Sequence, residues 1–397
     1  MTLPILFAAL QSGQLWVVDD ELAHGADFAQ ITEALAVATD DDAILVREGV
    51  YDSFELIDRG ARIFSLANER PVVLGTVKVR GQRAGQSVVL DGLRVVAGGV
   101  GLLIDNAQEP VWLEDLLVQV YPQFHVPLPA LVVYDCADVV MAAVHVGPAL
   151  ESTDVGTGGA QVTDSVLHIY DSHFEASASA SATPVPLPGM SVGGSVVFAS
   201  GTTFVGADGW SAALDGLGAC TNAGDGQPGL IALSSKLLES EVKLIDCTFV
   251  GGEGGLGLGS CPAGEVGPAQ SIAPESSVAE LEVQLGARSY DVTSVIGQGQ
   301  TGQIHFQGSP GEVVANYIGL MPNPVFQADV KGSFGALGSI LVFQAGVLDG
   351  HGQLTQNLQL VLPHGFSYLD LYAQGIFVSF VDGIVLGTPR AVLFAAP

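Results

Sequence analysis

One pattern of apolar and polar positions recurs along the middle of the chain. Each copy has a short run of alternating apolar residues, then a small or acidic turn residue, then a β-branched or aromatic residue that closes the copy. The six copies read VVLDGLRV, VWLEDLLV, VVMAAVHV, VLHIYDSHF, VVFASGTTF and VKLIDCTF. They close at Val95, Val118, Val146, Phe174, Phe204 and Phe249. A repeat of this size, rich in β-branched residues and glycine, predicts a solenoid of short parallel strands with inserted loops.

The segment before the repeats predicts a cap for the open end of this solenoid. Residues 15–18 and 43–49 have the composition of strands, and between them Phe28, Ile31 and Leu35 recur at helical spacing. Asp27 is a suitable N-cap residue for a helix over residues 28–37. Because a stacked core is open at its ends, we expect this helix to cover the first coil.

The rest of the sequence predicts how the chain is divided into domains. Residues 1–14 contain an apolar stretch without a basic start, so they are either the remnant of a signal sequence or a first strand. Residues 15–262 form the predicted solenoid, and residues 263–280, enriched in Pro, Ala, Ser and Gly, predict a linker. In residues 281–397, alternating strands are separated by Gly and Pro turns, which predicts an antiparallel β-sandwich.

A family resemblance supports this all-β architecture. The run VVDDELAHGADFAQITEALAVATDDDAILVREGVYDSF resembles the entry segment of right-handed parallel β-helix proteins of the pectin-lyase-like superfamily, and the six repeats continue it. The C-terminal part resembles a sandwich module found in secreted bacterial surface proteins. The resemblance implies a right-handed parallel β-helix in an exported protein. It does not choose a function, because the superfamily includes lyases, hydrolases, esterases, adhesins and proteins without known activity.

Composition and charge exclude several classes of protein. Of the 397 residues, 48% are apolar and 14% are charged, so the chain has enough apolar surface to fold and is not disordered. Its 42 acidic and 13 basic residues give a net charge of −29, which excludes nucleic acid and anionic membranes as partners. The most apolar stretches are far shorter than the roughly 20 residues of a membrane helix, so we expect no membrane insertion.

The four cysteines fit an oxidising compartment, such as the cell envelope or the exterior. Cys220 and Cys261 both lie in Gly-rich, loop-like text, and we predict a disulfide between them. The alternative is that all four cysteines are buried thiols.

Aligning the repeats predicts three columns of outward side chains, because alternate strand residues point in opposite directions. The first column is Val89, Trp112, Val140, His168, Phe198 and Lys243. The second is Asp91, Glu114, Ala142, Tyr170, Ser200 and Ile245. The third is Arg94, Leu117, His145, His173, Thr203 and Thr248.

These columns contain candidate ligand-binding residues. Aromatic faces beside polar groups suit sugar rings, which have apolar faces and hydroxyl edges. The predicted binding residues for a polysaccharide or cell-surface glycan are Trp112, His145, His168, Tyr170 and His173. The alternative is a mixed surface covered by loops, which the apolar Val140, Phe198 and Ile245 in the same columns favour.

Asp91 and Glu114 are candidate catalytic residues, because they stand in one column on consecutive rungs. A spacing of about 5 Å is close to that of the two carboxylates of retaining glycosidases. Surface carboxylates or a Ca²⁺ ligand pair explain the same spacing. A polyuronate lyase is disfavoured, since residues 96–287 contain no Arg and only Lys236 and Lys243.

Asp residues next to Gly form a third group of candidates. Asp208, Asp215 and Asp225 could offer oxygen ligands to Ca²⁺, although Asp-Gly pairs are also ordinary turn formers.

Together these patterns predict an exported protein that acts as a non-enzymatic glycan-binding or adhesive module. Two alternatives remain: a carbohydrate-active enzyme, with a neutral-polysaccharide glycosidase ahead of a lyase, and a structural component of a surface layer or filament. The sequence leaves oligomerisation open.

Overall fold

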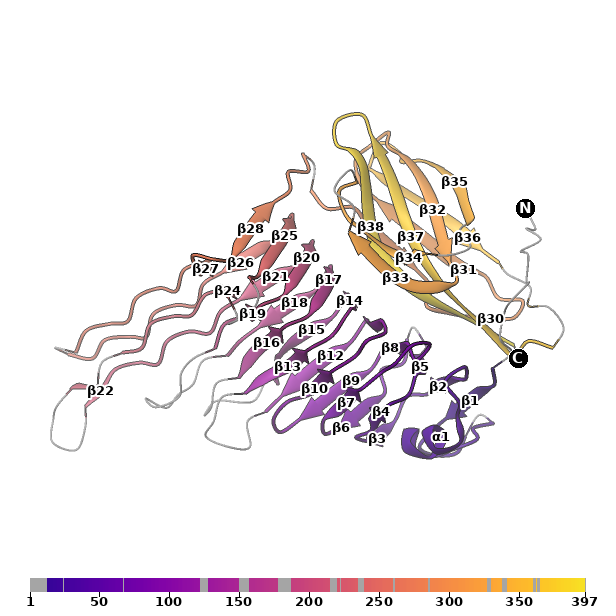
Figure 1. Cartoon of the computed structure of the whole chain (residues 1–397), viewed down its shortest axis with the longest axis horizontal. Coiled ribbons are helices and arrows are strands. Elements are labelled where there is room, and N and C mark those ends of the chain that lie inside the picture. Colours follow the sequence, from indigo (N-terminus) through magenta and orange to yellow (C-terminus); the bar gives the residue numbers. More distant parts are fainter. Residues whose placement is uncertain are drawn as a thin grey trace.

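The computed structural model describes residues 13–396 except 24, 67, 122–127, 150–156, 178–186, 215–219, 222, 235–238, 260, 285, 327–329, 338–340, 360–361 and 363–364. The chain forms a parallel β-helix followed by a domain of antiparallel and mixed sheets, as the sequence predicts (Figure 1). Within these ranges no helix is long and apolar enough to cross a membrane.

Three parallel sheets make up the β-helix, and successive coils add one strand to each. The first sheet contains β1 (Leu15–Val18), β2 (Ala43–Val46), β5 (Ala61–Ser65), β8 (Val88–Asp91), β11 (Val111–Glu114), β14 (Val139–Ala142), β17 (Val166–Tyr170), β20 (Val196–Ser200), β25 (Glu241–Ile245) and β28 (Ser277–Glu280). The second contains β4 (Glu55–Ile57), β7 (Val77–Arg80), β10 (Leu102–Asp105), β13 (Pro129–Tyr134), β16 (Gly158–Thr163), β19 (Met190–Gly193), β24 (Leu230–Leu233) and β27 (Gln270–Ile272). The third contains β3 (Val50–Asp52), β6 (Val72–Leu74), β9 (Arg94–Ala97), β12 (Leu117–Val120), β15 (His145–Pro148), β18 (His173–Glu175), β21 (Thr203–Val205) and β26 (Thr248–Val250).

The repeat pattern of the sequence has a direct structural cause. Inward side chains of each coil stack into one apolar core, in which the rings of Phe174, Phe204 and Phe249 follow one another at 5.6 Å and 5.2 Å. In each of the six repeats the small or acidic residue after the first-sheet strand has a positive φ, for example 46° at Asp115 and 45° at Asp171. Only residues that tolerate the left-handed region suit this corner, which joins the first sheet to the third.

The capping helix is present but shorter than predicted. Helix α1 spans Ile31–Val37 and buries Ile31, Ala34 and Leu35 against the end of the core. Asp27 does not cap it, because its carboxylate accepts a hydrogen bond from the amide of Val17. Glu33 instead accepts from the amides of Ala29 and Gln30, so the helix starts at Ile31, after Gln30.

The predicted linker at residues 263–280 is wrong, because residues 270–280 of this segment form strands of a further coil of the β-helix. Strand β27 pairs in parallel with β24, and β28 pairs in parallel with β25. The polar, Pro-containing composition resembles that of a linker because much of this terminal coil is exposed and does not need the apolar alternation of the inner coils. Of the possible signal segment at residues 1–14, residues 1–12 lie outside the described residues.

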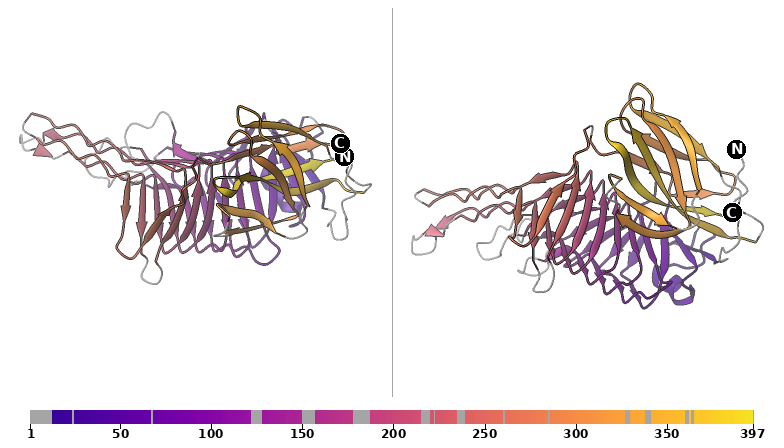
Figure 2. Two further views of the ribbon diagram at one scale, coloured as in Figure 1. Left: turned by 90° about the horizontal axis from the view of Figure 1, so that it is seen from above. Right: turned by 45° about the horizontal axis from the view of Figure 1, so that its top comes forward.

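The C-terminal domain is a β-sandwich. One sheet contains β29 (Ser289–Val292), β31 (Gly302–Gln307) and β36 (Gln353–Leu358), and the other contains β30 (Val295–Gly297), β38 (Gly383–Ala395), β37 (Tyr368–Ser379), β32 (Val313–Gly319) and β35 (Leu341–Val347). A hairpin of β33 (Met321–Phe326) and β34 (Ser333–Leu337) completes it. Apolar residues of both sheets form a second core. The domain folds back over the outward face of the first sheet (Figures 1 and 2).

A narrow arm projects from the β-helix at the end remote from α1 (Figure 2). It consists of extended segments within residues 206–229 and 251–268, with β22 (Ala213–Leu214) and β23 (Cys220–Thr221) paired near its tip. Several of its hydrogen-bonded amides follow one another in steps of three residues, as in Gly206, Gly209 and Ala212, and in Gly252 and Gly255. A three-residue step is that of a polyproline II helix.

Glycine is required in this arm because neighbouring backbones touch there. A Cβ atom on Gly252 would lie 1.9 Å from the carbonyl oxygen of Ala207. The disulfide between Cys220 and Cys261 joins two segments of the arm and confirms the predicted pairing.

Candidate functional site

The three outward columns predicted from the repeats exist in the predicted register. Trp112 is the direct neighbour of Val89 on one side and of Val140 on the other. Glu114 pairs with Asp91, and His145 pairs with His173. Side chains from distant parts of the sequence therefore do lie side by side on the outward faces of the same sheets.

The C-terminal domain covers the first two columns, so the expected exposed aromatic platform is wrong. Trp112 is 0% exposed and Tyr170 is 1% exposed. The Trp112 ring packs edge-on against Tyr372 with centroids 5.0 Å apart, and the Tyr170 hydroxyl donates to the carbonyl of Ser333 at 2.9 Å. The alternative of a covered face is correct, but the cover is the folded-back sandwich instead of inserted loops. Large apolar side chains in both columns supply the driving force for this docking.

His168 also lies beneath the C-terminal domain, at 4% exposure. It lines a cavity of about 230 Å³ together with Lys243 and Phe326. Neither ring nitrogen has a hydrogen-bond partner among the described residues, and Nε2 lies 3.7 Å from Oδ1 of Asp138.

Glu114 is the polar centre of the covered face. Its Oε2 accepts hydrogen bonds from the indole nitrogen of Trp112 at 3.0 Å and from the amide of Ala391 at 2.7 Å. Its Oε1 lies 3.4 Å from Nη1 of Arg390. Burial raises the pKa of Glu114, while Arg390, the Ala391 amide and the indole act in the opposite direction. The carboxylate thus links strand β11 of the β-helix to strand β38 of the sandwich.

Asp91 lies beside Glu114 but has fewer polar partners to stabilise a charge on its carboxyl. Its Oδ2 is buried and has no hydrogen-bond partner among the described residues. Burial and then the charge of Glu114 raise the pKa of Asp91 well above its ordinary value. Two adjoining buried carboxyls ionise together only at a high cost, so the charge of Glu114, which Arg390 and the Ala391 amide stabilise, favours the protonated form of Asp91.

The two carboxyls are the ones expected to form a glycosidase pair in an open groove. The structure brings them together on consecutive rungs as expected, but at 1% and 2% exposure they are closed off beneath the sandwich. No polysaccharide can reach them without separation of the two domains.

Arg390 connects this buried pair to an open pocket beside it. Its Nη2 lies 3.2 Å from Oδ1 of Asp291, and its side chain is 11% exposed. Burial opposes charge on Arg390, but the carboxylates of Glu114, Asp291 and Asp171 outweigh it and raise its pKa. The pocket has a volume of about 500 Å³. It is lined by Asp171, Ser289, Asp291, His305, Phe306, Gln307, Gln353, Thr355 and Arg390.

The pocket is mostly polar, and its lining side chains belong to the sandwich except for Asp171, which comes from the β-helix. Asp171 belongs to the corner of a repeat, and its carboxyl accepts a hydrogen bond from the hydroxyl of Thr388. Burial raises the pKa of Asp171, with Thr388 and Arg390 opposing it. Nδ1 of His305 and the hydroxyl of Thr355 share a hydrogen bond of 3.0 Å. Sequence reasoning missed these residues, because no spacing in the C-terminal text indicates which rung of the β-helix it will face.

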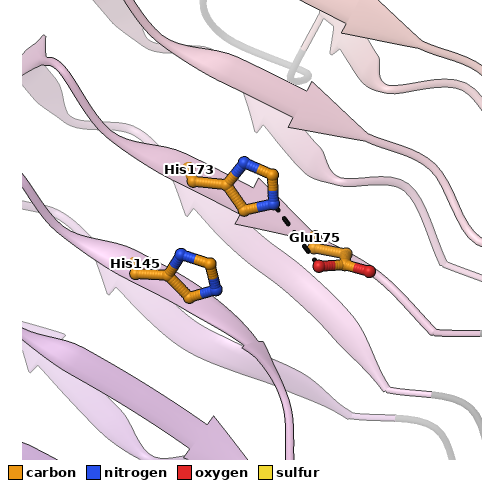
Figure 3. A group of neighbouring side chains, drawn as sticks. All are labelled: His145, His173 and Glu175. Atoms are coloured by element: carbon orange, nitrogen blue, oxygen red, sulfur yellow. Dashed lines mark hydrogen bonds and ion pairs between the residues drawn. The ribbon is translucent and has the colours of Figure 1, made fainter. Parts of the chain in front are cut away.

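The third column lies on another sheet and is not covered by the sandwich. His145 is exposed and His173 half-buried, and their rings stack with centroids 4.7 Å apart (Figure 3). Nε2 of His173 lies 3.4 Å from Oε2 of Glu175. His145, His173 and Glu175 form the group of three metal-ligating side chains found in the described part of the chain.

The predicted calcium ligands do not belong to that group. Asp208 and Asp225 lie in extended segments of the arm, where each accepts a backbone hydrogen bond, from Glu253 and Glu265 respectively. The Asp and Gly residues of this part of the sequence therefore belong to the extended, polyproline-like segments of the arm and not to turns. Asp215 lies outside the described residues.

Comparisons with known proteins identify no family. No protein-family model matches the chain, and no curated protein matches it. Among solved structures, the superoxide reductase (neelaredoxin) from Ignicoccus hospitalis is 11% identical, with 28% of this chain and 82% of that chain covered and a TM-score of 0.17. The enzymatically active domain of bacteriophage CBA120 tailspike protein 4 is 12% identical, with 96% of this chain and 55% of that chain covered and a TM-score of 0.23. At these TM-scores neither likeness carries an argument about this protein.

Proposed function

We propose that this chain is an exported β-helix protein of the pectin-lyase-like type that binds a glycan without cleaving it, in the pocket between its two domains. The observation that carries the proposal is the pocket of about 500 Å³, lined mainly by polar side chains of the sandwich and bordered on the β-helix by Asp171. Binding sites commonly lie where a rigid scaffold meets a second domain.

The chemistry of the lining suits a polyhydroxylated ligand. Asp291 and Asp171 accept hydrogen bonds, Gln307 and Gln353 both donate and accept, and Arg390 donates. Sugar hydroxyls offer both donors and acceptors, so such a mixture can satisfy several of them at once. Phe306 is buried, so the ring does not offer an open stacking face, and recognition depends on the polar groups.

The enzymatic alternative has less support. A glycosidase needs two carboxyls that reach the scissile bond, whereas Asp91 and Glu114 are buried and already engaged in joining the domains. Export is supported by the Cys220–Cys261 disulfide, since such bonds persist in oxidising compartments.

A glycan array probed with the purified full-length chain tests the proposal. We expect binding to one class of glycan, and a reducing-end assay on the bound glycans should detect no cleavage. His305→Ala and Gln353→Ala should each reduce that binding, because both side chains line the pocket. His351→Ala, at an exposed site outside the pocket lining, is the matched control. An array without any bound glycan, or binding that survives both pocket variants, would contradict the proposal.

One observation favours a structural role instead. The arm carries exposed apolar side chains, with Leu256 73% and Val266 69% exposed. Such residues could be buried when copies of the chain assemble. If Leu256→Ser together with Val266→Ser abolishes assembly that the unchanged chain shows in light scattering, the structural role gains support. A monomer at all concentrations would remove it.

A further inference from the structure

The geometry points to a binding site for a divalent transition-metal ion on the third sheet, formed by His145, His173 and Glu175 with one coordination position left open (Figure 3). This site is separate from the pocket between the domains. It uses two of the side chains that the sequence places in the third column.

The register of the β-helix creates the site. His145 on β15 pairs directly with His173 on β18, and Val146 pairs with Phe174. The next pair of positions, Gly147 and Glu175, therefore points to the same outward face as the two histidines. Parallel pairing thus brings four outward positions together. His145, His173 and Glu175 carry metal-ligating side chains, and the fourth position, Gly147, has no side chain.

Glycine at the fourth position matters for access. A Cβ atom on Gly147 would lie 3.7 Å from Nε2 of His145 and 3.6 Å from Cβ of Glu175. A longer side chain there would occupy the space between the ligand atoms. Because Gly147 has no side chain, nothing at this position competes with the three ligand side chains for the ion.

The distances allow the three side chains to share one ion once the two stacked rings rotate, so that the lone pairs in their ring planes converge. The three ligand atoms lie within 4.8 Å of one another, and Nε2 of His173 is 3.4 Å from Oε2 of Glu175. Tetrahedral Zn²⁺ with bonds of about 2.0–2.1 Å holds its ligand atoms about 3.3 Å apart. His145 is exposed, so its ring can rotate without disturbing the core.

The charge of the whole protein also favours a cation. The net charge of −29 raises the local concentration of cations around the protein.

The donor set selects the class of ion. Two imidazole nitrogens and one carboxylate oxygen suit Zn²⁺ and related transition ions such as Cu²⁺, Ni²⁺ and Co²⁺. Ca²⁺ takes six to eight oxygen ligands, so this site should not hold it. The histidine pair therefore differs in chemistry from the calcium site that the Asp-Gly text suggested.

Isothermal titration of the metal-free full-length chain with Zn²⁺ tests the inference. We expect one Zn²⁺ per chain, and an affinity that falls by about tenfold or more in His145→Ala, His173→Ala and Glu175→Gln. His351→Ala is the matched control, since His351 is an exposed histidine outside the cluster and its loss should leave the affinity unchanged. Titration with Ca²⁺ should give no heat that depends on these residues.

A second readout separates a metal site from a simple ladder of stacked rings. Zn²⁺ should raise the midpoint of thermal unfolding of the unchanged chain and of His351→Ala, but not that of His173→Ala. Circular dichroism of each variant checks that the β-helix is retained. Absence of Zn²⁺ binding, or equal loss in His351→Ala, would overturn the inference. So would variants that lower the unfolding midpoint while the Zn²⁺ affinity stays the same.

Discussion

Replacing Asp91 by asparagine is expected to stabilise the protein at neutral pH, although the residue lies in a buried interface. Asp91 has an unpartnered buried oxygen and stands directly beside Glu114. Asparagine has the shape of a protonated aspartic acid but never ionises. The substitution thus removes a cost of holding the group neutral and leaves the packing almost unchanged.

The sign follows from the raised pKa of Asp91. Between its ordinary value of 3.8 and its folded value, the folded state binds more protons than the unfolded state. The stability of the unchanged chain therefore falls as the pH rises through this window. Asp91→Asn lacks that fall, so its advantage is absent near pH 4 and grows toward neutral pH.

Two estimates bound the size of the effect. An ionised Asp91 about 4.8 Å from Glu114 would be repelled by about 3 kcal/mol at an effective dielectric constant of 20. Holding a carboxyl of pKa 3.8 neutral at pH 7 costs at most about 4 kcal/mol. We therefore expect Asp91→Asn to raise the free energy of unfolding by roughly 1–4 kcal/mol at pH 7, and by less than about 0.5 kcal/mol near pH 4.

Urea denaturation followed by tryptophan fluorescence measures this, because Trp112 lies in the same interface. Asp135→Asn is the matched control. It removes the same charge from an exposed corner residue that also has a positive φ, so the change should be within about 0.5 kcal/mol. A variant Asp91→Asn that is no more stable than the unchanged chain at pH 7, or equally stabilised at both pH values, would refute the reasoning.

Three further predictions concern the interface and the arm. Glu114→Ala should destabilise the docked domain by about 3–5 kcal/mol in the same denaturation assay, because Arg390, the Ala391 amide and the Trp112 indole lose their acceptor; an unchanged midpoint would contradict the docking. Cys261→Ser opens a loop with a sequence separation of 41, worth about 4 kcal/mol of chain entropy, and should speed proteolytic cleavage within the arm while the β-helix stays resistant. Gly252→Val should disrupt the arm and speed its proteolytic cleavage, since the added Cβ would lie 1.9 Å from the carbonyl oxygen of Ala207. Gly259→Val should speed cleavage less despite the positive φ there, because no atom lies within 4 Å of a Cβ added at Gly259. Equal cleavage of both variants would count against the close packing.

The sequence predicted the β-helix well because its coils obey local rules. Corner residues such as Asp115 and Asp171 need a positive φ, and the apolar residues before them must point inward. Both needs recur in every copy, so alignment of the copies gave the outward columns in their true register.

The same reasoning could not predict what covers those columns. The contact of Glu114 with Ala391 joins residues 277 positions apart, and no repeat relates the two segments. Apolar Val140, Phe198 and Ile245 in the columns did indicate a cover, but not which part of the chain supplies it. The pocket residues Asp291 and His305 depend on that docking and have no signal of their own.

The amino-acid composition gave the wrong expectation for the arm, whose structure is not an ordinary sheet. The Gly-rich text of residues 251–268 resembles a flexible loop, yet its backbone hydrogen bonds step regularly by three. Small residues are needed there because chains approach each other closely, a reason that composition alone does not distinguish from turn formation.

The docking of the sandwich on the first sheet is the claim on which the rest depends, and Trp112 reports on it directly. Replacing Trp16 and Trp210 by phenylalanine leaves Trp112 as the single tryptophan of the full-length chain. We predict a blue-shifted emission that acrylamide barely quenches, because Trp112 is fully buried against Tyr372. A red-shifted emission with strong quenching in the folded protein would show that the face is open, and would contradict the account.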